Sequence, residues 1–384
     1  MNLVFVTPGL RGGGAEQALA DIANGFARQG RAVQIISLAH EADISYLDGR
    51  VPVRFLQDAE ESAERGGTVF DKLRRRIRVA LRLRRALIQT GSGVRVIGFL
   101  EPIALYLWLV RLMGGPRYLV SLHTQESLFF RQLFQNRLRL WLEEMLLGAA
   151  CRASEHVTLP SEGCCRDLIQ HFNVPAEKVR TLQNPVDLEK VRRLACVEPE
   201  WAGVMHGKAI FVQVARLVAP KNHRLLVEAC KRLRAKHEDF IVICCGEGPL
   251  RPAIESWIAE AGLENHIRLL GHISNPYALM ARARGVLLTS DYESFGLVLV
   301  EAMVCGTPPI STDCPSGPAD VLSEGAGLLV PLDAPDAFSD AMLRLIKDDA
   351  LHAALQKSGL MKAKTYSADN AVRLWSSLLT ETQG

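Results

Sequence analysis

The stretch LVFVTPGLRGGGAEQALADIANGFARQGRAVQIISL, residues 3–38, decides the fold class. It opens on an apolar run typical of a buried strand, and a glycine-rich loop follows. The next segment places Leu19, Ile22 and Phe26 on one face of a helix. That helix is expected to end at Gly30, before a second apolar run. A strand, a helix and a strand in this order predict a parallel sheet.

The same order of elements recurs in the second half of the chain. Apolar runs typical of buried strands lie at 209–215, 240–246, 267–271 and 285–290, and an amphipathic segment at 223–237 separates the first two. Strands that alternate with helices again indicate βαβ units. The second half is therefore expected to form a second parallel sheet.

The boundary between these halves is marked by an Asn-Pro pair within 182–191, where we place a hinge. We predict an α/β fold with one doubly wound domain at 1–184 and another at 185–360. The remaining segment, 361–384, is expected to be a helix that can pack back across the hinge. Two doubly wound domains of similar size predict an inter-domain cleft lined by the carboxyl ends of the strands.

The composition describes a soluble, globular protein. The 384 residues are 48% hydrophobic and 23% charged, and the net charge of +3 gives no global signal for polyanion binding. The start lacks a basic n-region and no stretch reaches ~18 uncharged apolar residues, so neither a signal peptide nor a membrane-spanning helix is expected. Nine cysteines without a C-x-x-C motif favour reduced thiols in a cytosolic setting. The sequence has no clustered His/Cys spacing, which argues against a zinc site.

The glycine cluster Gly12, Gly13 and Gly14 lies between the first strand and the first helix. Successive glycines let backbone N–H groups approach an anion at a helix N-terminus. The alternative is a tight loop that binds nothing. A nicotinamide dinucleotide site is disfavoured, because Gln17 stands where the G-x-G-x-x-G pattern requires a small residue.

Two cations, Arg216 and Lys221, follow the first strand of the second domain. Arg bridges two oxygens and Lys supplies a compact charge, so the pair suits a diphosphate. The alternative is two solvated loop charges. Their position at the carboxyl end of a predicted sheet favours the binding function.

Two carboxylates bracket the apolar run ESFGLVLVE, residues 293–301. Glu301 lies within an apolar helix, and carboxylates are rarely buried without a partner. The backbone N–H groups at the helix N-terminus lack helical partners and suit a phosphate, while the carboxylates suit vicinal hydroxyls of a sugar or ribose. The alternative role for Glu293 is a charge that pairs with the helix dipole.

Together these patterns resemble the retaining glycosyltransferases of family 4, which have the GT-B architecture of two facing Rossmann-like domains. The resemblance spans nearly the whole chain and rests on five motifs in the family's order. They are the glycine loop at 12–14, the pair Arg216 and Lys221, GEGP at 246–249, the E-x7-E pattern from Glu293 to Glu301, and G-x-P-x-I at 306–310.

The resemblance implies roles for residues of the second domain. Arg216 and Lys221 would bind the donor diphosphate and stabilise the leaving group. Glu301 would hydrogen-bond the ribose, and the base would lie near Gly271 and Ile273. The donor sugar would be held by Glu293 together with the backbone of Ser294, Phe295, Gly296 and Leu297.

The resemblance also implies roles for the first domain. Gly13 and Gly14 would bring its backbone up to the phosphates, and His123, after a predicted strand, would contact the donor sugar at the reacting centre. A structural role for His123 is the alternative. The sequence has no D-x-D pattern, so no metal is expected, and the protein's own cations would stabilise the phosphate charge. Family members retain the anomeric configuration by attack on the same face, so no cofactor or enzymic nucleophile is expected.

The segment KLRRRIRVALRLRRALIQ, residues 72–89, carries eight basic residues and no acidic one. An apolar stripe includes Ile77 and Leu81, and Arg74, Arg78, Arg82 and Arg85 form a basic face. Near an anionic leaflet each cation is worth about 1 kcal/mol. We expect contact with an anionic membrane surface here, with packing on the sheet as the alternative.

A second stretch, 127–147, repeats apolar residues at helical spacing with interspersed arginines. They are Phe130, Phe134, Leu138, Trp141 and Met145. We expect this stripe to belong to the core, with membrane contact as the alternative. Nucleic acid is not expected as a partner, because the basic residues lack interleaved aromatics for base stacking.

The sequence therefore predicts a retaining transfer of a sugar from a nucleoside-diphosphate sugar to a membrane-associated glycan, either a lipid-linked saccharide or lipopolysaccharide. The run at 313–322 is similar to one in family members that often use UDP-sugars, so UDP is favoured. The expected location is the cytoplasm, peripheral on the inner face of the cytoplasmic membrane. Alternatives are a soluble acceptor, a nucleotide-sugar epimerase of the same fold, or a non-catalytic membrane-associated partner with a degenerate site.

Overall fold

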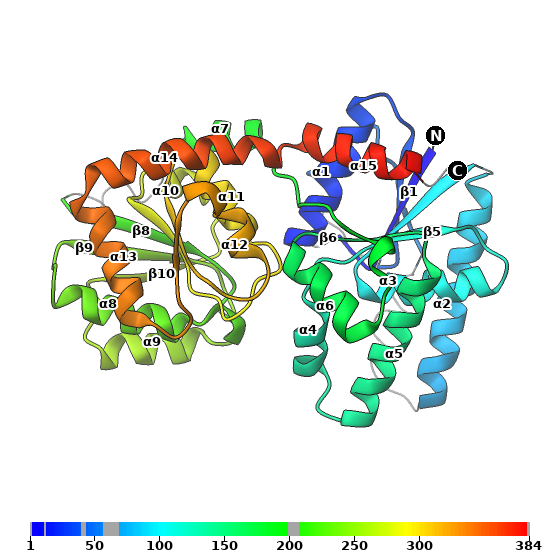
Figure 1. Ribbon diagram of the computed structural model, residues 1–384, viewed down its shortest axis with the longest axis horizontal. Coiled ribbons are helices and arrows are strands. Elements are labelled where there is room, and N and C mark those ends of the chain that lie inside the picture. Colours follow the sequence, from blue (N-terminus) through cyan, green and yellow to red (C-terminus); the bar gives the residue numbers. More distant parts are fainter. Residues whose placement is uncertain are drawn as a thin grey trace. The chain divides into compact units, whose positions relative to one another are not determined.

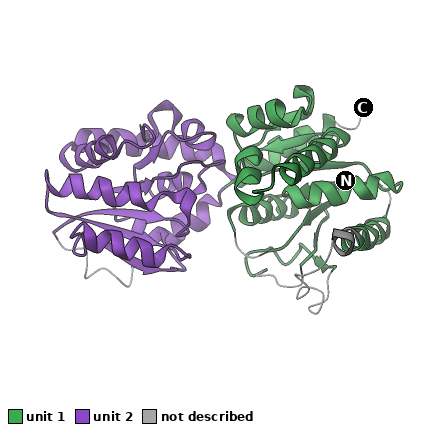
Figure 2. Cartoon of the chain, turned by 90° about the horizontal axis from the view of Figure 1, so that it is seen from below, with its two compact units in different colours: residues 1–185, 368–384 green, residues 186–367 purple. Residues whose placement is uncertain are grey.

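The structure is a computed structural model that describes residues 2–10, 13–39, 44–56, 69–91, 93–198 and 207–381, with the side chains of 69–73 left out. The chain divides into two compact units (Figure 2). Unit 1 consists of residues 1–185 and 368–384, and unit 2 of residues 186–367. The two parallel, doubly wound sheets described below confirm the predicted α/β class.

The sheet of unit 1 is parallel, with strand order β3-β2-β1-β4-β5-β6-β7 (Figure 1). Its strands are β1 Asn2–Thr7, β2 Val33–Ser37, β3 Val53–Phe55, β4 Val94–Phe99, β5 Tyr118–Ser121, β6 Val157–Leu159 and β7 Val179–Thr181. The order reverses between β1 and β4, and such a reversal positions the loops that bind ligands in doubly wound sheets.

Helices cover both faces of this sheet. They are α1 Gly14–Arg28, α2 Val69–Gln89, α3 Glu101–Leu112, α4 Glu126–Leu133, α5 Arg137–Ala153, α6 Glu162–Phe172 and α15 Ala368–Glu381, with a short 3-10 turn at Ala176–Lys178. Alternate residues of β1 point to opposite faces, so Val4 packs with α2, α3, α5 and α6, whereas Phe5 packs with α1 and α15. The sheet is thus buried on both sides, as parallel sheets require.

The last helix, α15, belongs to unit 1 although it follows unit 2 in the sequence. Its buried residues Val372 and Trp375 join the same core cluster as Phe26 of α1. Gly25 of α1 permits the close approach, because a Cβ there would lie 2.5 Å from Val372 Cγ2. The Trp375 ring also stacks on Phe99 with 6.3 Å between ring centroids.

Replacement of Trp375 by alanine is expected to lower the free energy of unfolding of unit 1 by about 3–5 kcal/mol, because it leaves a large cavity in a closed core. Urea unfolding followed by circular dichroism measures the loss, and amide hydrogen exchange assigns it to unit 1. The matched control is Leu374→Ala on the exposed side of the same helix. Equal stability of the two variants would contradict a core role for Trp375.

The basic helix α2 differs from its predicted pattern. Its buried side is formed by Val79, Ala80, Leu83, Ala86 and Leu87. Ile77 and Leu81, two residues of the predicted apolar stripe, are exposed on the side that also carries Arg74 and Arg78. The buried face of α2 is the one that contacts α3 and the sheet. The periodicity of the sequence did not distinguish this face from the exposed one. Part of the predicted segment, the side chains of 72 and 73, lies outside the described residues.

The stretch 127–147 is not one helix. Helix α4 ends at Leu133, and α5 begins at Arg137 after Asn136, whose side chain accepts a hydrogen bond from the Arg139 amide at 3.0 Å. Phe130 is buried as expected, but the side chains of Leu138 and Trp141 are 73% and 56% exposed. The core prediction is therefore wrong for the α5 residues, because the break after α4 turns the start of α5 away from the sheet.

Unit 2 contains a parallel sheet with order β10-β9-β8-β11-β12-β13. Its strands are β8 Ala209–Val214, β9 Phe240–Cys245, β10 Ile267–Gly271, β11 Gly285–Leu288, β12 Pro309–Thr312 and β13 Leu328–Val330. The order reverses between β8 and β11, so the loops after these two strands diverge over opposite faces.

The helices of unit 2 are α7 Leu188–Ala195, α8 His223–Arg234, α9 Arg251–Glu260, α10 Tyr277–Met280, α11 Leu297–Val304, α12 Gly317–Val321, α13 Pro335–Lys347 and α14 Asp349–Ala363. Short 3-10 turns lie at Ala219–Lys221, Ser323–Gly325 and Lys364–Tyr366. Helices α8, α9 and α13 pack on the face that carries Phe211 and Val242, whereas α10 and α11 pack on the face that carries Val212 and Ile243.

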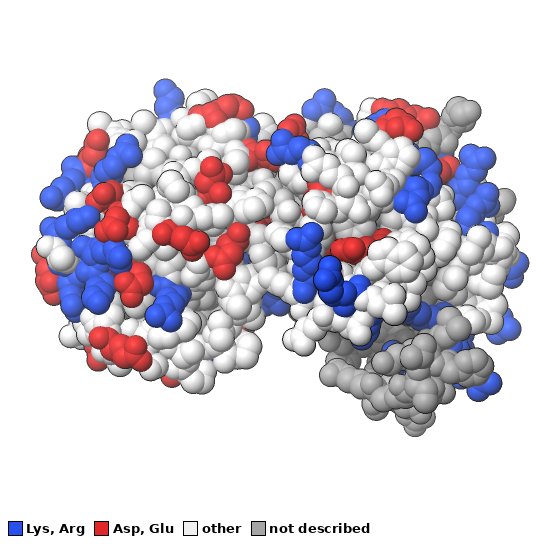
Figure 3. All heavy atoms as spheres, turned by 60° about the horizontal axis from the view of Figure 1, so that its bottom comes forward, with Lys and Arg blue, Asp and Glu red and all other residues white. Residues whose placement is uncertain are grey.

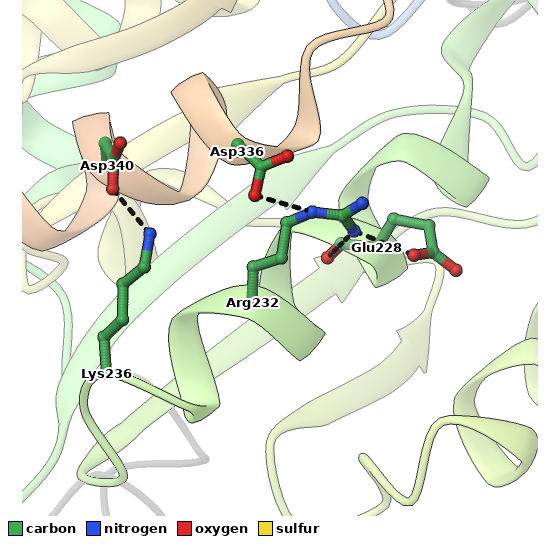
Figure 4. Close-up of polar contacts among 5 residues, drawn as sticks. All are labelled: Glu228, Arg232, Lys236, Asp336 and Asp340. Atoms are coloured by element: carbon green, nitrogen blue, oxygen red, sulfur yellow. Dashed lines mark hydrogen bonds and ion pairs between the residues drawn. The ribbon is translucent and has the colours of Figure 1, made fainter.

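Surface ion pairs join α8 and the residues just after it to α13 on the solvent side (Figure 4). Arg232 Nε lies 2.9 Å from Asp336 Oδ1, and Lys236 Nζ lies 2.7 Å from Asp340 Oδ1. On the face of unit 2 seen in Figure 3, basic and acidic side chains are interspersed. Exposed pairs of this kind contribute roughly 0–1 kcal/mol each to stability, so we assign them no functional role.

Candidate functional site

The loop after β8 brings Lys221 to Glu293, 72 residues further along the chain. Lys221 Nζ donates to Glu293 Oε1 in an ion pair, with side-chain exposures of 18% and 16%. The 3-10 turn that ends at Lys221 is held in place because Thr289 Oγ1 donates to the Lys221 carbonyl at 2.8 Å. The Thr289 oxygen in turn accepts from Gln213 Nε2 at 2.9 Å. Lys221 is thus fixed at the carboxyl edge of the sheet.

Glu293 is positioned by the loop that precedes α12. The amide of Gly317 donates to the Glu293 carbonyl at 2.8 Å, and Glu293 forms an isolated parallel bridge with Ser316. Ser316 adopts φ +88°, a conformation that costs energy for a residue with a side chain. Gly317 cannot carry a side chain, because a Cβ there would clash with the Phe295 backbone. Two loops are therefore locked together at this carboxylate.

Helix α11 begins beside this ion pair. Gly296, at φ +87°, is its N-cap, so the predicted donor-sugar residues Ser294 to Leu297 lie at the turn into the helix. Phe295 is buried and meets the Tyr366 ring edge-on, at 5.5 Å between ring centroids. The turn is therefore anchored in the core.

Glu301 lies inside α11, one turn further on. Tyr277 Oη donates to Glu301 Oε1 at 2.9 Å. Burial raises the pKa of Glu301 above its ordinary value, while the Tyr277 hydrogen bond and the charge of Lys190 lower it. Tyr277 was not identified from the sequence. A tyrosine in the short helix that precedes β11 belongs to no motif, and only the approach of α10 to α11 reveals it.

Arg216 behaves differently from Lys221. Its side chain is exposed, and it makes no ion pair within the described residues. Its neighbour in the same loop, Leu217, is buried, and the Leu217 amide donates to the Glu247 carbonyl at 2.9 Å. The loop is therefore ordered while the Arg216 guanidinium extends from it. The structure does not bring Arg216 into contact with the Lys221–Glu293 pair.

The GEGP turn packs directly on the loop of Arg216. A Cβ at Gly246 would clash with the Ala215 carbonyl, and one at Gly248 would clash with the Leu217 backbone. The Gly246 amide donates to the Gly271 carbonyl at 2.7 Å, which ties the end of β10 to the same edge. Gly271 has φ +79°, and the loops after β8, β9 and β10 thus meet around it.

His223 is a second residue that sequence reasoning missed. It follows Asn222 at the start of α8 and is buried, and neither ring nitrogen has a hydrogen-bond partner in the described part of the chain. Burial and the nearby Lys221 charge lower its pKa to about 4. The imidazole is therefore neutral near pH 7 and adds no charge to the site.

In unit 1, Gly13 caps α1 with an extended backbone at φ −71°, and Gly14 is the first helical residue. The Gly13 amide donates to Glu16 Oε2 at 3.0 Å, so in this state that N–H group is occupied by the chain's own carboxylate. An anion that uses this amide would have to displace Glu16. Gly12 lies outside the described residues.

His123 follows β5 at the carboxyl edge of the same sheet. Its ring stacks on Phe99 with 5.0 Å between centroids, and Ser121 Oγ lies 3.0 Å from Nε2. Burial lowers the pKa of His123 to about 4, although Asn184 acts in the opposite direction. His123 is therefore neutral near pH 7. It shares this sheet edge with the loop of Gly13, while the remaining predicted residues belong to unit 2.

A hollow of about 360 Å³ lies in unit 1 among α2, α3, α4 and α5. Apolar side chains that include Leu105, Phe130 and Phe134 line it. Arg139 lies over the Phe134 ring at 4.7 Å, and Arg76 Nη2 pairs with Glu143 Oε1 at 3.1 Å. The hollow therefore combines an apolar wall with two arginines and the carboxylates of Glu101 and Glu143, and it has a volume typical of small-molecule sites.

Among the described residues, no helix is both long and apolar enough to cross a lipid bilayer. The same residues contain no group of three or more His, Cys, Asp or Glu side chains arranged to hold a metal ion.

Comparison with known proteins places the chain among enzymes that transfer sugars. Residues 12–190 match the family described as Glycosyltransferase Family 4, and residues 201–360 match the family described as Glycosyl transferases group 1. The chain belongs to the family 4 type of glycosyltransferases, with the two Rossmann-like domains of the GT-B fold.

Two curated relatives come from Campylobacter jejuni subsp. jejuni. The chain is 28% identical over 262 residues, 67% of this chain and 68% of the relative, to N-acetylgalactosamine-N,N'-diacetylbacillosaminyl-diphospho-undecaprenol 4-alpha-N-acetylgalactosaminyltransferase. It is 22% identical over 385 residues, 100% of this chain and 99% of the relative, to GalNAc-alpha-(1->4)-GalNAc-alpha-(1->3)-diNAcBac-PP-undecaprenol alpha-1,4-N-acetyl-D-galactosaminyltransferase.

Among solved structures, the chain is similar to HepE of Anabaena in complex with UDP and glucose. The TM-score is 0.81 at 18% sequence identity, and the alignment covers 99% of this chain and 100% of that chain. At this identity the likeness establishes the shared fold.

Proposed function

We propose that the chain transfers a sugar, with retention of configuration, from a UDP-sugar to a glycan carried on a membrane lipid. The observation that carries the proposal is the ion pair between Lys221 and Glu293 just before the N-terminus of α11, with the half-buried carboxylate of Glu301 one turn into the helix. A cation, the N-terminus of a helix and two carboxylates together fit a phosphate flanked by two hydroxyl-bearing sugars.

In this proposal the residues divide the donor between them. Lys221 and Arg216 bind the diphosphate, Glu301 accepts hydrogen bonds from the ribose, and Glu293 accepts them from the donor sugar. The base lies against the loop from Gly271 to Ile273. Because Lys221 and Glu293 pair with each other without ligand, donor binding exchanges that ion pair for contacts with phosphate and sugar.

The proposed reaction needs no nucleophile from the protein. The bond between the anomeric carbon and the diphosphate oxygen breaks, and the acceptor oxygen bonds to the same face of that carbon. The acceptor proton passes to a phosphate oxygen of the leaving UDP. Lys221 and Arg216 stabilise the charge that develops on the diphosphate, so transfer is expected to persist when divalent metal is removed by a chelator.

Two comparisons support the donor and the acceptor. HepE binds UDP and glucose in the same fold, and both Campylobacter relatives carry diphospho-undecaprenol or PP-undecaprenol in their names. In unit 1, the apolar hollow with Arg76 and Arg139 offers a place for an amphipathic acceptor. The arginines would contact the anionic head of such a lipid, and the apolar wall would contact its hydrocarbon tail.

The donor is tested by thermal unfolding with UDP, GDP, CDP, ADP and TDP and their common sugar conjugates. A ligand at about a hundred times its Kd stabilises the protein by roughly 2.7 kcal/mol, which shifts the midpoint measurably. We expect UDP and one UDP-sugar to respond. A response only to another nucleotide would replace UDP, and transfer with inversion of the product anomer would refute the retaining mechanism.

The outer side of α2 supports the proposal of a peripheral position on an anionic membrane. Ile77 and Leu81 are exposed there among the arginines, which is the combination that binds lipid interfaces. Replacing Arg74, Arg78, Arg82 and Arg85 together by glutamine is expected to reduce binding to anionic vesicles, since each cation contributes about 1 kcal/mol near such a surface. Co-sedimentation at low and high salt measures the change.

The control replaces Arg224, Arg234, Arg268 and Arg344 of unit 2 by glutamine, which removes the same number of charges. Vesicle binding of this variant should equal that of the unmodified protein. Unchanged co-sedimentation of the α2 variant would refute the membrane contact, and full transfer to a soluble acceptor without membranes would favour a soluble substrate.

A further inference from the structure

Helix α5 carries large apolar side chains on its solvent side. Leu138, Trp141, Leu142 and Met145 are 73%, 56%, 43% and 45% exposed. Their spacing of i, i+3, i+4 and i+7 places them on one face of the helix, where they form a strip that we call the α5 stripe. Single exposed apolar residues are ordinary on protein surfaces, whereas a contiguous apolar patch marks an interaction site. The α5 stripe therefore indicates a partner.

The opposite side of α5 belongs to the core of unit 1. Leu147, Ala150 and Cys151 are buried there, in the same cluster as residues of the sheet. A rotation of the helix that covered the stripe would bring these three residues into water, which costs free energy. The stripe is therefore held on the outside by the packing of the rest of the helix.

The charged residues around the stripe select the kind of partner. Arg137 and Arg139 flank it on its two sides, and both are exposed. The two acidic residues of α5, Glu143 and Glu144, are half-buried, and Glu143 pairs with Arg76 of α2 at 3.1 Å. Leucines and a tryptophan bordered by arginines are typical of helices that lie in the interface of a lipid bilayer.

We propose that the α5 stripe inserts into the interface of a lipid bilayer, with the axis of α5 parallel to the membrane. The contact is apolar, because the burial of the stripe drives it. It therefore differs from the electrostatic contact proposed for α2, which depends on anionic lipid. Insertion is independent of the sugar that the protein transfers.

The stripe borders the hollow of unit 1. Leu142 is three residues after Arg139 and four residues before Leu146, and both of these neighbours line the hollow. An inserted stripe would hold the hollow beside the lipid head groups. This relation rests on the proposed function, in which the hollow receives a glycan carried on a lipid.

The fluorescence of Trp141 reads insertion directly. The chain has five tryptophans, and the difference between the unmodified protein and Trp141→Phe isolates the signal of Trp141. We expect this signal to shift to shorter wavelength when phosphatidylcholine vesicles are added, and to be quenched when the acyl chains carry bromine. The signal of the half-buried Trp257 in unit 2, isolated in the same way, should show neither effect. Absence of both effects at Trp141 would overturn the proposal.

Co-sedimentation with vesicles measures the strength of the contact. Leu138→Ser, Leu142→Ser and Met145→Ser together are expected to weaken binding to phosphatidylcholine vesicles by more than about tenfold, because three apolar side chains no longer leave water. High salt should not reduce this difference, whereas it screens electrostatic contacts. The three side chains are exposed, so the midpoint of thermal unfolding should stay the same. Equal binding of the variant and the unmodified protein would refute insertion.

The matched control carries Leu329→Ser, Leu332→Ser and Met361→Ser, which removes exposed residues of the same types from unit 2. It should bind vesicles as the unmodified protein does. Sedimentation velocity without lipid tests the competing occupant, a second copy of the chain. Self-association that the α5 substitutions abolish would replace the membrane by that second copy. If Trp141 inserts but no UDP-sugar is transferred, the role of the stripe stands and the proposed reaction fails.

Discussion

Lys221→Ala is expected to lower kcat/KM for sugar transfer by about 10²–10³-fold, the cost typical of removing one group that stabilises developing charge. Lys221 is held beside the N-terminus of α11 by the turn that Thr289 fixes, so its charge is pre-positioned for a diphosphate. The substitution removes that charge without changing the backbone of the turn. Initial rates with a UDP-sugar, together with the Kd for UDP, separate the loss in transfer from the loss in binding.

Lys236→Ala is the matched control. It removes the same kind of side chain from the same unit, where Lys236 pairs with Asp340 on the exposed side of α13 (Figure 4). Its rates should equal those of the unmodified protein, and both variants should unfold at similar temperatures. Normal turnover in Lys221→Ala would remove Lys221 from the proposed phosphate site.

Glu293→Gln is expected to have opposite effects on UDP binding and on transfer. In the unliganded chain the Glu293 carboxylate forms an ion pair with the Lys221 ammonium group, and it therefore competes with a diphosphate for that cation. Glutamine removes the negative charge but keeps the shape, so the Kd for UDP should fall by about fivefold, the equivalent of roughly 1 kcal/mol for a partly exposed ion pair. Transfer should fall by about 10²-fold, because the carboxylate no longer accepts hydrogen bonds from the donor sugar.

Calorimetric titration with UDP and initial-rate measurements test the two effects separately. Asp340→Asn, which breaks the exposed pair with Lys236, is the control for loss of one negative charge from unit 2. It should change neither quantity. Weaker UDP binding in Glu293→Gln would contradict the proposed exchange of partners, and unchanged transfer would contradict the sugar contact.

The candidate site was predictable from the sequence to the extent that its residues lie in motifs. The glycines, the pair of cations and the two spaced carboxylates are identifiable in the sequence by residue type and spacing, and their order along the chain carries the family resemblance. Tyr277 was not predictable, because ordinary core positions contain the same residue type. Its place in the candidate site is visible only from the contact of its hydroxyl with Glu301.

The predicted helix faces show the same limit. In α2 the periodicity identified an amphipathic helix, but Ile77 and Leu81 are exposed, and the residues around Val79 and Leu83 are buried. Apolar residues occur on more than one side of this helix, so the sequence contained two possible inward faces. Contact with α3 and the sheet selects one of them, and a periodicity count does not include that contact.

The sequence by itself determined the succession of strands and helices in both units, because buried strands and amphipathic helices follow from patterns within short segments. It also determined the order of the motifs that carry the family resemblance. Only the tertiary structure decided that α15 completes the core of unit 1 and that Lys221 meets Glu293. Both contacts join residues far apart in the chain. A helix buries its apolar face, and a cation pairs with a carboxylate, wherever the fold brings the two partners together. A pattern within a short segment does not contain that information.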